Sequence, residues 1–76
     1  MEEVSIVLNG EKKSFRMGTT VRELLEQFKV PVGTVVVELN EEIVSKESHA
    51  RVQLNEGDRV ELVRFVGGGR TPRVKE

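Results

Sequence analysis

The 76-residue sequence contains no cysteine, no tryptophan and no tyrosine. Without cysteine, the chain can form no disulfide, thiolate zinc site, iron–sulfur cluster or cysteine nucleophile. No apolar run approaches the roughly 18 residues of a membrane-spanning helix, so we expect no membrane partner. The acidic start Met1-Glu2-Glu3 lacks the layout of a signal peptide, and we expect a cytoplasmic protein.

The sequence also lacks an excess of charge of either sign, because 12 Lys and Arg residues nearly balance 13 Asp and Glu residues, for a net charge of −1. The segment 70–76 carries three cations and one anion, which is +2, so residues 1–69 carry −3. Phosphate contacts need clustered cations, and this acidic body therefore argues against a nucleic-acid partner. A chain of this length forms one small domain, and we expect a monomer.

The N-terminal part of the sequence has the pattern of a β-hairpin. Alternating apolar residues predict a first strand with one buried face: Val4, Ile6 and Leu8. Asn9-Gly10 follows at once and is typical of the type I′ turn that joins antiparallel strands. A second strand is expected at residues 11–17, with Phe15 and Met17 on one face.

A short helix is predicted after this hairpin. Thr20 and Glu23 have the spacing of a capping box, in which each side chain accepts a hydrogen bond from the other residue's backbone N–H. Apolar residues at i, i+3, i+4 and i+7 form one stripe that we expect to face the sheet: Val21, Leu24, Leu25 and Phe28. Pro31 prevents the helix from continuing.

The second half of the chain reads as three more strands. Residues 34–39 are rich in β-branched side chains and predict the third strand, and Ile43-Val44 a short fourth one. The polar stretch 45–51 is expected to be irregular, with the single histidine, His49, as a solvated loop residue. The last strand is expected at residues 59–66.

The order of elements is therefore strand, strand, helix, strand, short strand, strand. A helix of about two turns is not stable alone, so it must lie across one face of the sheet in an α+β architecture. Placing the first and last strands side by side as a central parallel pair gives a ubiquitin-like β-grasp, with a mixed sheet of four to five strands. We expect this domain to span residues 1–66, and residues 67–76 to form a flexible Gly-rich tail.

Apolar residues of outward parity predict a docking surface on the sheet face opposite the helix. Val63 and Phe65 share this parity on the last strand, as does Val36 on the third. The alternative is that Phe65 folds over an edge of the core. The predicted partner-binding residues are those on this face and at the end of the last strand: Val36, Val63, Arg64, Phe65 and Val66.

The three glycines Gly67, Gly68 and Gly69 directly follow the last predicted strand. A phosphate-binding loop would open a helix and carry Lys followed by Ser or Thr, whereas Arg70-Thr71 and no helical pattern follow here. Glycine allows a backbone to pass where any Cβ would collide. The run is therefore suited to an extended arm that enters the active site of another protein.

Four stretches of the sequence resemble the ThiS family of sulfur carriers, and together they extend the resemblance over residues 4–69. They are the turn Asn9-Gly10, the helix residues 20–25, the strand and turn residues 36–44, and residues 55–69 with Phe-Val before the glycines. The resemblance implies a β-grasp protein that is not itself an enzyme. It binds no cofactor or metal, and partner enzymes act on its C-terminal glycine.

In this family an E1-like enzyme of the ThiF type adenylates that glycine, using ATP and Mg²⁺ bound on the enzyme. Sulfur then converts it to a thiocarboxylate, which a thiazole synthase of the ThiG type uses in thiamine biosynthesis. The resemblance assigns this role to Gly69, with Gly68 and Gly67 as the arm. Sulfur delivery to homocysteine or a pterin cofactor, or a β-grasp interaction module without sulfur chemistry, remains an alternative.

The chain departs from the family pattern because it continues with Arg70–Glu76. The Gly69 carbonyl is then part of a peptide bond and offers no free carboxylate. The resemblance therefore implies that a processing peptidase, a metalloprotease in similar pathways, removes residues 70–76 before the carrier acts. The alternatives are that residues 70–76 are not native to the protein, or that this chain has lost the carrier role.

Overall fold

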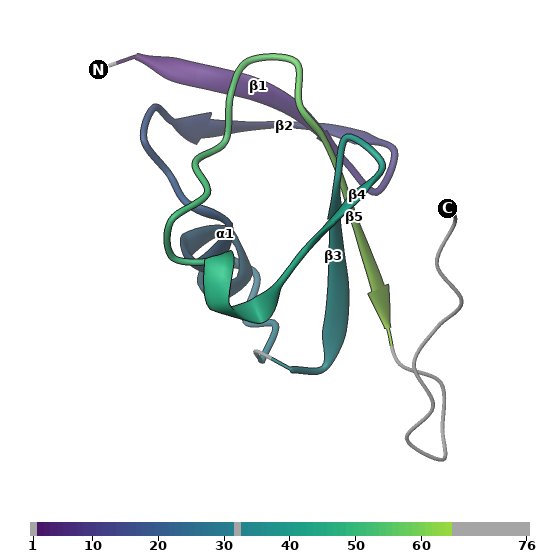
Figure 1. Ribbon diagram of the computed structural model, residues 1–76. Coiled ribbons are helices and arrows are strands. Elements are labelled where there is room, and N and C mark those ends of the chain that lie inside the picture. Colours follow the sequence, from purple (N-terminus) through teal and green to yellow (C-terminus); the bar gives the residue numbers. More distant parts are fainter. Residues whose placement is uncertain (1, 32, 65–76) are drawn as a thin grey trace.

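The computed structural model describes residues 2–31 and 33–64. Its elements follow one another as β1 (Glu3–Leu8), β2 (Glu11–Arg16), α1 (Val21–Gln27), β3 (Val35–Leu39), β4 (Glu42–Val44), the short 3₁₀ helix η1 (Lys46–Ser48) and β5 (Arg59–Arg64). The strands form one five-stranded sheet in the order β2-β1-β5-β3-β4, and α1 lies on one side of it (Figure 1).

The two middle strands β1 and β5 are parallel, whereas all other neighbours are antiparallel. The predicted central parallel pair is thus confirmed, and with it the mixed sheet and the single helix of a ubiquitin-like β-grasp. The β1–β2 turn has positive φ at Asn9 (49°) and Gly10 (84°), as a type I′ turn requires. This local geometry returns β2 beside β1 with Val4 opposite Phe15.

Helix α1 begins with the predicted capping box. The Thr20 hydroxyl accepts from the Glu23 backbone N–H at 3.2 Å, and the Glu23 carboxylate accepts from the Thr20 backbone N–H at 3.0 Å. Each satisfied donor stabilises a helix that is too short to persist alone. Burial of Val21, Leu24 and Leu25 against the sheet provides the larger contribution, because all three are fully buried.

The core lies between α1 and the sheet. Its buried hydrophobic residues are Val4, Ile6, Leu8, Phe15, Val21, Leu24, Leu25, Val35, Val37, Leu54 and Val60. The inward parity expected for β1, β3 and β5 is confirmed, with Leu39 and Leu62 half-buried at its margin. Leu54 precedes the turn before β5 and closes the core from the loop side, a role that its irregular surroundings did not reveal.

One predicted core residue, Phe28, lies instead at the surface, and so does Met17, which was expected on the same face as the buried Phe15. Met17 is 56% exposed, because β2 ends at Arg16 and the chain turns through Gly18 at φ 93°. Phe28 is 42% exposed, because α1 ends at Gln27 and Phe28 is its C-cap. In the sequence, the alternation of β2 extends to Met17 and the apolar stripe of α1 extends to Phe28. Each pattern thus runs one position past the end of its element.

The expectation of a solvated His49 is wrong. This side chain is 5% exposed, in a stretch that folds into η1 and a following turn. Its backbone carbonyl accepts from Arg22 N of α1 at 2.9 Å, which draws the segment against the helix. The predicted end of the last strand, Phe65 and Val66, and the predicted tail of residues 67–76 lie outside the described residues.

Candidate functional site

The sheet face opposite α1 carries an apolar surface formed by three strands. Val36 on β3 lies directly opposite Val63 on β5, and both side chains are half-buried. Ile43 on β4 is 51% exposed and pairs with Glu38, so it shares a face with Val36 and lies diagonal to it. We call Val36, Ile43 and Val63 the outer-face patch.

Two of the predicted partner-binding residues, Val36 and Val63, are thus brought together, and the structure adds Ile43 to them. Sequence reasoning missed Ile43 because a strand of three residues has too little alternation to define its faces. A hollow of about 310 Å³ lies beside the patch, near the start of β3 and the end of β4. Its lining includes Val36 and Ile43. The patch is therefore an apolar surface with a recess at its edge.

Carboxylates border this patch. Glu38 on β3 and Glu61 on β5 are register partners on the outer face, so two like charges stand directly opposite each other. Such a pair is destabilising in a sheet. It gives the region next to the patch a negative potential that a cationic group on a partner would neutralise.

The structure places Arg64 on the other face. Arg64 pairs with the inward-facing Val35 at the end of β5, and both line a hollow of about 360 Å³ on the helix side with Phe28 and Leu62. Arg64 therefore does not join Val36 and Val63 on one surface. The remaining predicted site residues, Phe65, Val66 and Gly67–Gly69, lie outside the described residues.

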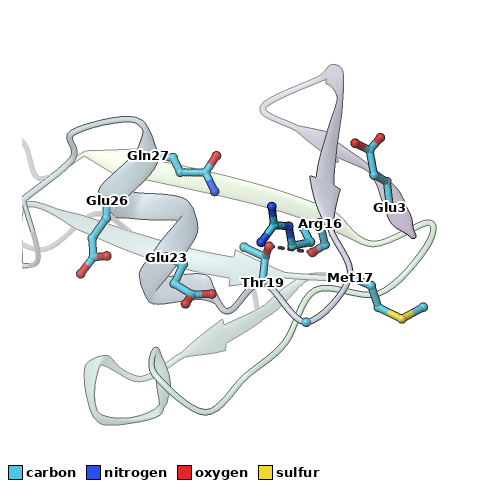
Figure 2. Close-up of a pocket in the computed structure, with 8 residues that line it drawn as sticks. Glu3, Arg16, Met17, Thr19, Glu23, Glu26 and Gln27 are labelled. Carbon is cyan, nitrogen blue, oxygen red and sulfur yellow. Dashed lines mark hydrogen bonds between the residues drawn. The ribbon is translucent and has the colours of Figure 1, made fainter. Parts of the chain in front are cut away.

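A further hollow of about 770 Å³ lies between one side of α1, the start of β1 and the end of β2. Figure 2 shows its polar side chains projecting from these elements, with the Thr19 hydroxyl donating to the Arg16 carbonyl at 2.6 Å. The Glu23 carboxylate, which lines this hollow, already accepts the hydrogen bond from the Thr20 backbone N–H in the helix cap. The hollow has no histidine, and its one hydroxyl is already hydrogen-bonded, so it presents no activated nucleophile.

His49 offers no catalytic arrangement either. Its Nε2 lies 3.3 Å from the Val44 carbonyl, and its Nδ1 is buried without a hydrogen-bond partner. Among residues 2–31 and 33–64, no group of three or more His, Asp or Glu side chains could hold a metal ion. No helix in that part of the chain is long and apolar enough to cross a membrane.

The fold and the site together define a class of protein. A ubiquitin-like sheet bears an apolar outer face, and three glycines follow its last strand in the sequence. These features are typical of β-grasp proteins that present a C-terminal arm to partner enzymes. The sequence model of the ThiS family matches residues 3–69, and the chain belongs to that family.

Individual relatives agree with this assignment. The chain is 46% identical over 66 residues, 87% of its length, to a thiazole synthase of Paramagnetospirillum magneticum, of which it covers 20%. It is 40% identical over 63 residues to the sulfur carrier protein ThiS of Bacillus subtilis, covering 82% of this chain and 96% of that protein. The crystal structure of a thiamine biosynthesis protein (ThiS) from Geobacter metallireducens superimposes with a TM-score of 0.75 at 33% identity, covering 87% of this chain and all of that one.

The lengths of these relatives differ in an informative way. The chain spans about a fifth of the length of the relatives named thiazole synthase, and nearly the whole of the one named sulfur carrier. The matched region is thus a unit that occurs both alone and within a longer protein.

Proposed function

We propose that this chain is a sulfur carrier, acted on by partner enzymes and not itself a catalyst, whose reactive end is the carboxylate of Gly69. The observation that carries the proposal is the family match, which ends at Gly69, the last residue of the glycine run. The relative from Bacillus subtilis named as a sulfur carrier supports it.

The chemistry proceeds in two balanced steps. A Gly69 carboxylate oxygen attacks the α-phosphorus of ATP, and pyrophosphate leaves, so that an acyl adenylate forms. Sulfide then attacks the acyl carbon and AMP leaves, which yields a thiocarboxylate and one proton. Adenylation is needed because a carboxylate is a poor electrophile, and an E1-like enzyme of the ThiF type supplies the site that holds ATP and Mg²⁺.

The outer-face patch is the proposed docking surface for that enzyme. Val36, Ile43 and Val63 expose apolar area on one face of the sheet, and Phe65 and Val66 follow β5 in the sequence. The Glu38–Glu61 pair beside the patch favours a partner with a cationic rim. Docking on the sheet leaves the glycine arm free to reach into the enzyme.

Thiazole synthesis is the proposed destination of the sulfur. Two relatives named thiazole synthase contain a region similar to this chain, at 46% and 39% identity, which supports a partnership with a synthase of the ThiG type. Arg70–Glu76 would first have to be removed, and a metalloprotease that cleaves after Gly69 is the proposed processing enzyme. A chain that is charged with sulfur but does not serve thiazole synthase would instead supply another pathway, such as that of homocysteine or a pterin cofactor.

Intact mass spectrometry tests the carrier function. A chain ending at Gly69 is incubated with a ThiF-type enzyme, ATP, Mg²⁺ and sulfide. We expect AMP formation and the mass gain of one oxygen replaced by sulfur, whereas the full chain, protected from peptidases, stays unchanged. The same truncated chain with Gly69→Val should fold and remain uncharged, because a side chain at the last position obstructs the arm. An inert truncated chain, or a full chain charged at Glu76, would overturn the proposal.

A matched pair of surface substitutions tests the docking surface. Ile43 and Met17 are similarly exposed, at 51% and 56%, but lie at opposite edges of the sheet. Ile43→Ser should raise the concentration of carrier needed for half-maximal adenylation, and Met17→Ser should not. Equal effects of both substitutions would place docking elsewhere.

A further inference from the structure

The two central strands β1 and β5 are paired over only a short distance. Their parallel register comprises Val7 with Arg59 and Leu8 with Val60. After Leu8 the chain turns back into β2, whereas β5 continues to Arg64. On its other edge, β5 remains paired with β3 as far as Arg64.

Asn9 bridges the gap that opens between these strands. Its backbone N–H donates to the Val60 carbonyl at 2.9 Å, and its side-chain Oδ1 accepts from the Leu62 backbone N–H at 2.8 Å. The carboxamide thus replaces the backbone carbonyl that a longer β1 would offer to Leu62. A single residue both reverses the chain, at φ 49°, and extends the β1–β5 pairing by two residues.

Asparagine is suited to both tasks. It adopts the left-handed conformation more readily than most residues, and its short side chain carries an acceptor at hydrogen-bonding reach of a neighbouring strand. Glycine would satisfy the turn but could not reach Leu62. Aspartate would retain an acceptor oxygen at the same position.

The Asn9–Leu62 hydrogen bond lies near the end of β5, close to where the chain leaves the sheet toward the glycines. Leu62 lies seven residues before Gly69, a contour of up to ~25 Å. The position of the end of β5 therefore bounds the region that Gly69 can reach, and a misplacement of ~1 Å at the reacting groups already slows a reaction markedly. A second edge contact near Leu62 restricts rotation of β5 about its pairing with β3.

We infer that Asn9 is a positioning residue, which acts through Leu62 to set the direction in which the chain leaves the sheet toward the activating enzyme. The inference rests on the proposed carrier function. The Asn9–Leu62 hydrogen bond is exposed, and Leu62 is a half-buried residue at the margin of the core and not one of its buried members. Its loss should therefore affect the arm more than the stability of the body.

Asn40, in the turn after β3, provides a control that contacts the same strand, β5. It also has a left-handed φ, 51°, and it also bonds to β5, with Oδ1 accepting from Arg59 N at 2.9 Å and its N–H donating to the Arg59 carbonyl at 2.7 Å. This contact holds the first residue of β5, at the end remote from the glycines. Asn40→Gly thus removes this bond and a second one, from Asn40 Nδ2 to Asp58 Oδ1 at 3.0 Å, without changing the base of the arm, which makes it a demanding control.

The first experiment measures amide hydrogen exchange in the full chain. Asn9→Gly should accelerate exchange of the Leu62 amide by about tenfold or more, while the Val37 amide in the core retains its protection. Asn9→Asp should restore protection at Leu62. Unchanged exchange at Leu62 in Asn9→Gly would show that the bond is not formed in solution and would overturn the inference.

The second experiment measures adenylation of the same variants in chains ending at Gly69, a truncation that leaves every core residue in place. Asn9→Gly should lower kcat by about tenfold with KM within about twofold, and Asn9→Asp should recover most of the loss. Asn40→Gly should retain the unsubstituted kcat. An unchanged kcat in Asn9→Gly, a change in KM alone, or an equal loss in Asn40→Gly would overturn the positioning role.

No AMP formation on the unsubstituted chain would overturn the proposed function and the positioning role with it. The exchange experiment would still decide whether the Asn9–Leu62 hydrogen bond exists.

Discussion

At the scale of single residues, the two ends of α1 show what periodicity can and cannot establish. Leu24 and Leu25 lie in the middle of the helix and are fully buried, as their spacing predicts. Phe28 belongs to the same stripe but is the C-cap, where the chain already departs from helical geometry. Its ring meets Phe15 edge to face at 6.1 Å between centroids, with Lys13 Nζ 5.9 Å from its centroid.

Leu24 and Phe28 should therefore differ in their contributions to stability. Leu24→Ala should lower the free energy of unfolding by about 2–5 kcal/mol, because it leaves a cavity in the core. Phe28→Ala should lower it by less, about 1–2 kcal/mol, since the residue is 42% exposed and loses only part of a buried area with an aromatic pair and a cation–π contact. Urea denaturation measures both. A larger loss for Phe28→Ala than for Leu24→Ala would contradict this packing.

His49 shows the opposite case, a polar residue that long-range contacts bury. Nothing in its polar neighbourhood distinguishes it from a solvated loop residue. The hydrogen bond from Arg22 N to its carbonyl joins η1 to the start of α1, and the ring then lies at the Val44 carbonyl. Segments 22 and 49 are distant in sequence, so this burial arises only in the folded chain.

At the scale of elements, the pairing of β3 with β5 brings together both halves of the candidate docking surface. The register that sets Val36 opposite Val63 also sets Glu38 opposite Glu61. The apolar pair stabilises the sheet, and the acidic pair opposes it. The same strand pairing therefore produces an apolar patch and a like-charge pair that a cationic partner can neutralise.

Glu61→Thr should stabilise the isolated protein by about 0.2–1 kcal/mol, because it removes a like-charge pair and introduces a β-branched residue. Urea denaturation at low ionic strength measures the gain, which should shrink as salt is added. Glu3→Thr is the control, since Glu3 lies opposite the cation Arg16 on the same face of the sheet. Equal gains in both variants would show that side-chain propensity, and not repulsion between Glu38 and Glu61, is responsible.

At the scale of the whole molecule, one thin core supports the entire fold. All its residues lie between Val4 and Val60, and β5 contributes to it from the middle of the sheet. A domain of this size buries only about 60% of the surface of its unfolded chain. Loss of the central strand β5 should therefore abolish the fold.

Two truncations test this expectation. A chain ending at Gly69 should match the full chain within about 0.5 kcal/mol in urea denaturation, because no core residue is removed. A chain ending at Asp58 lacks β5 and should show no cooperative transition, since both β1 and β3 lose their central neighbour. Marked destabilisation of the chain ending at Gly69 would mean that residues 70–76 belong to the folded body.

Much of the candidate site was foreseeable from the sequence, but not its completed surface. The outward parity of Val36 and Val63 followed from alternation within each strand, and the glycine run was visible directly. The addition of Ile43 required the register between strands, whereas Arg64 shares the parity of Val60 and Leu62, so alternation within β5 already placed it on the helix side. Alternation relates residues within one strand, whereas only pairing relates one strand to the next.

The sequence by itself determined the features that neighbouring residues encode. These are the left-handed turn at Asn9-Gly10, the capping box of Thr20 and Glu23, and the alternation that gives the strands one apolar face for a short helix to cover. Tertiary structure alone decided the burial of His49 and the bond from Leu62 to Asn9. Each of these joins residues far apart in the chain, so it forms only once the core has brought their elements together.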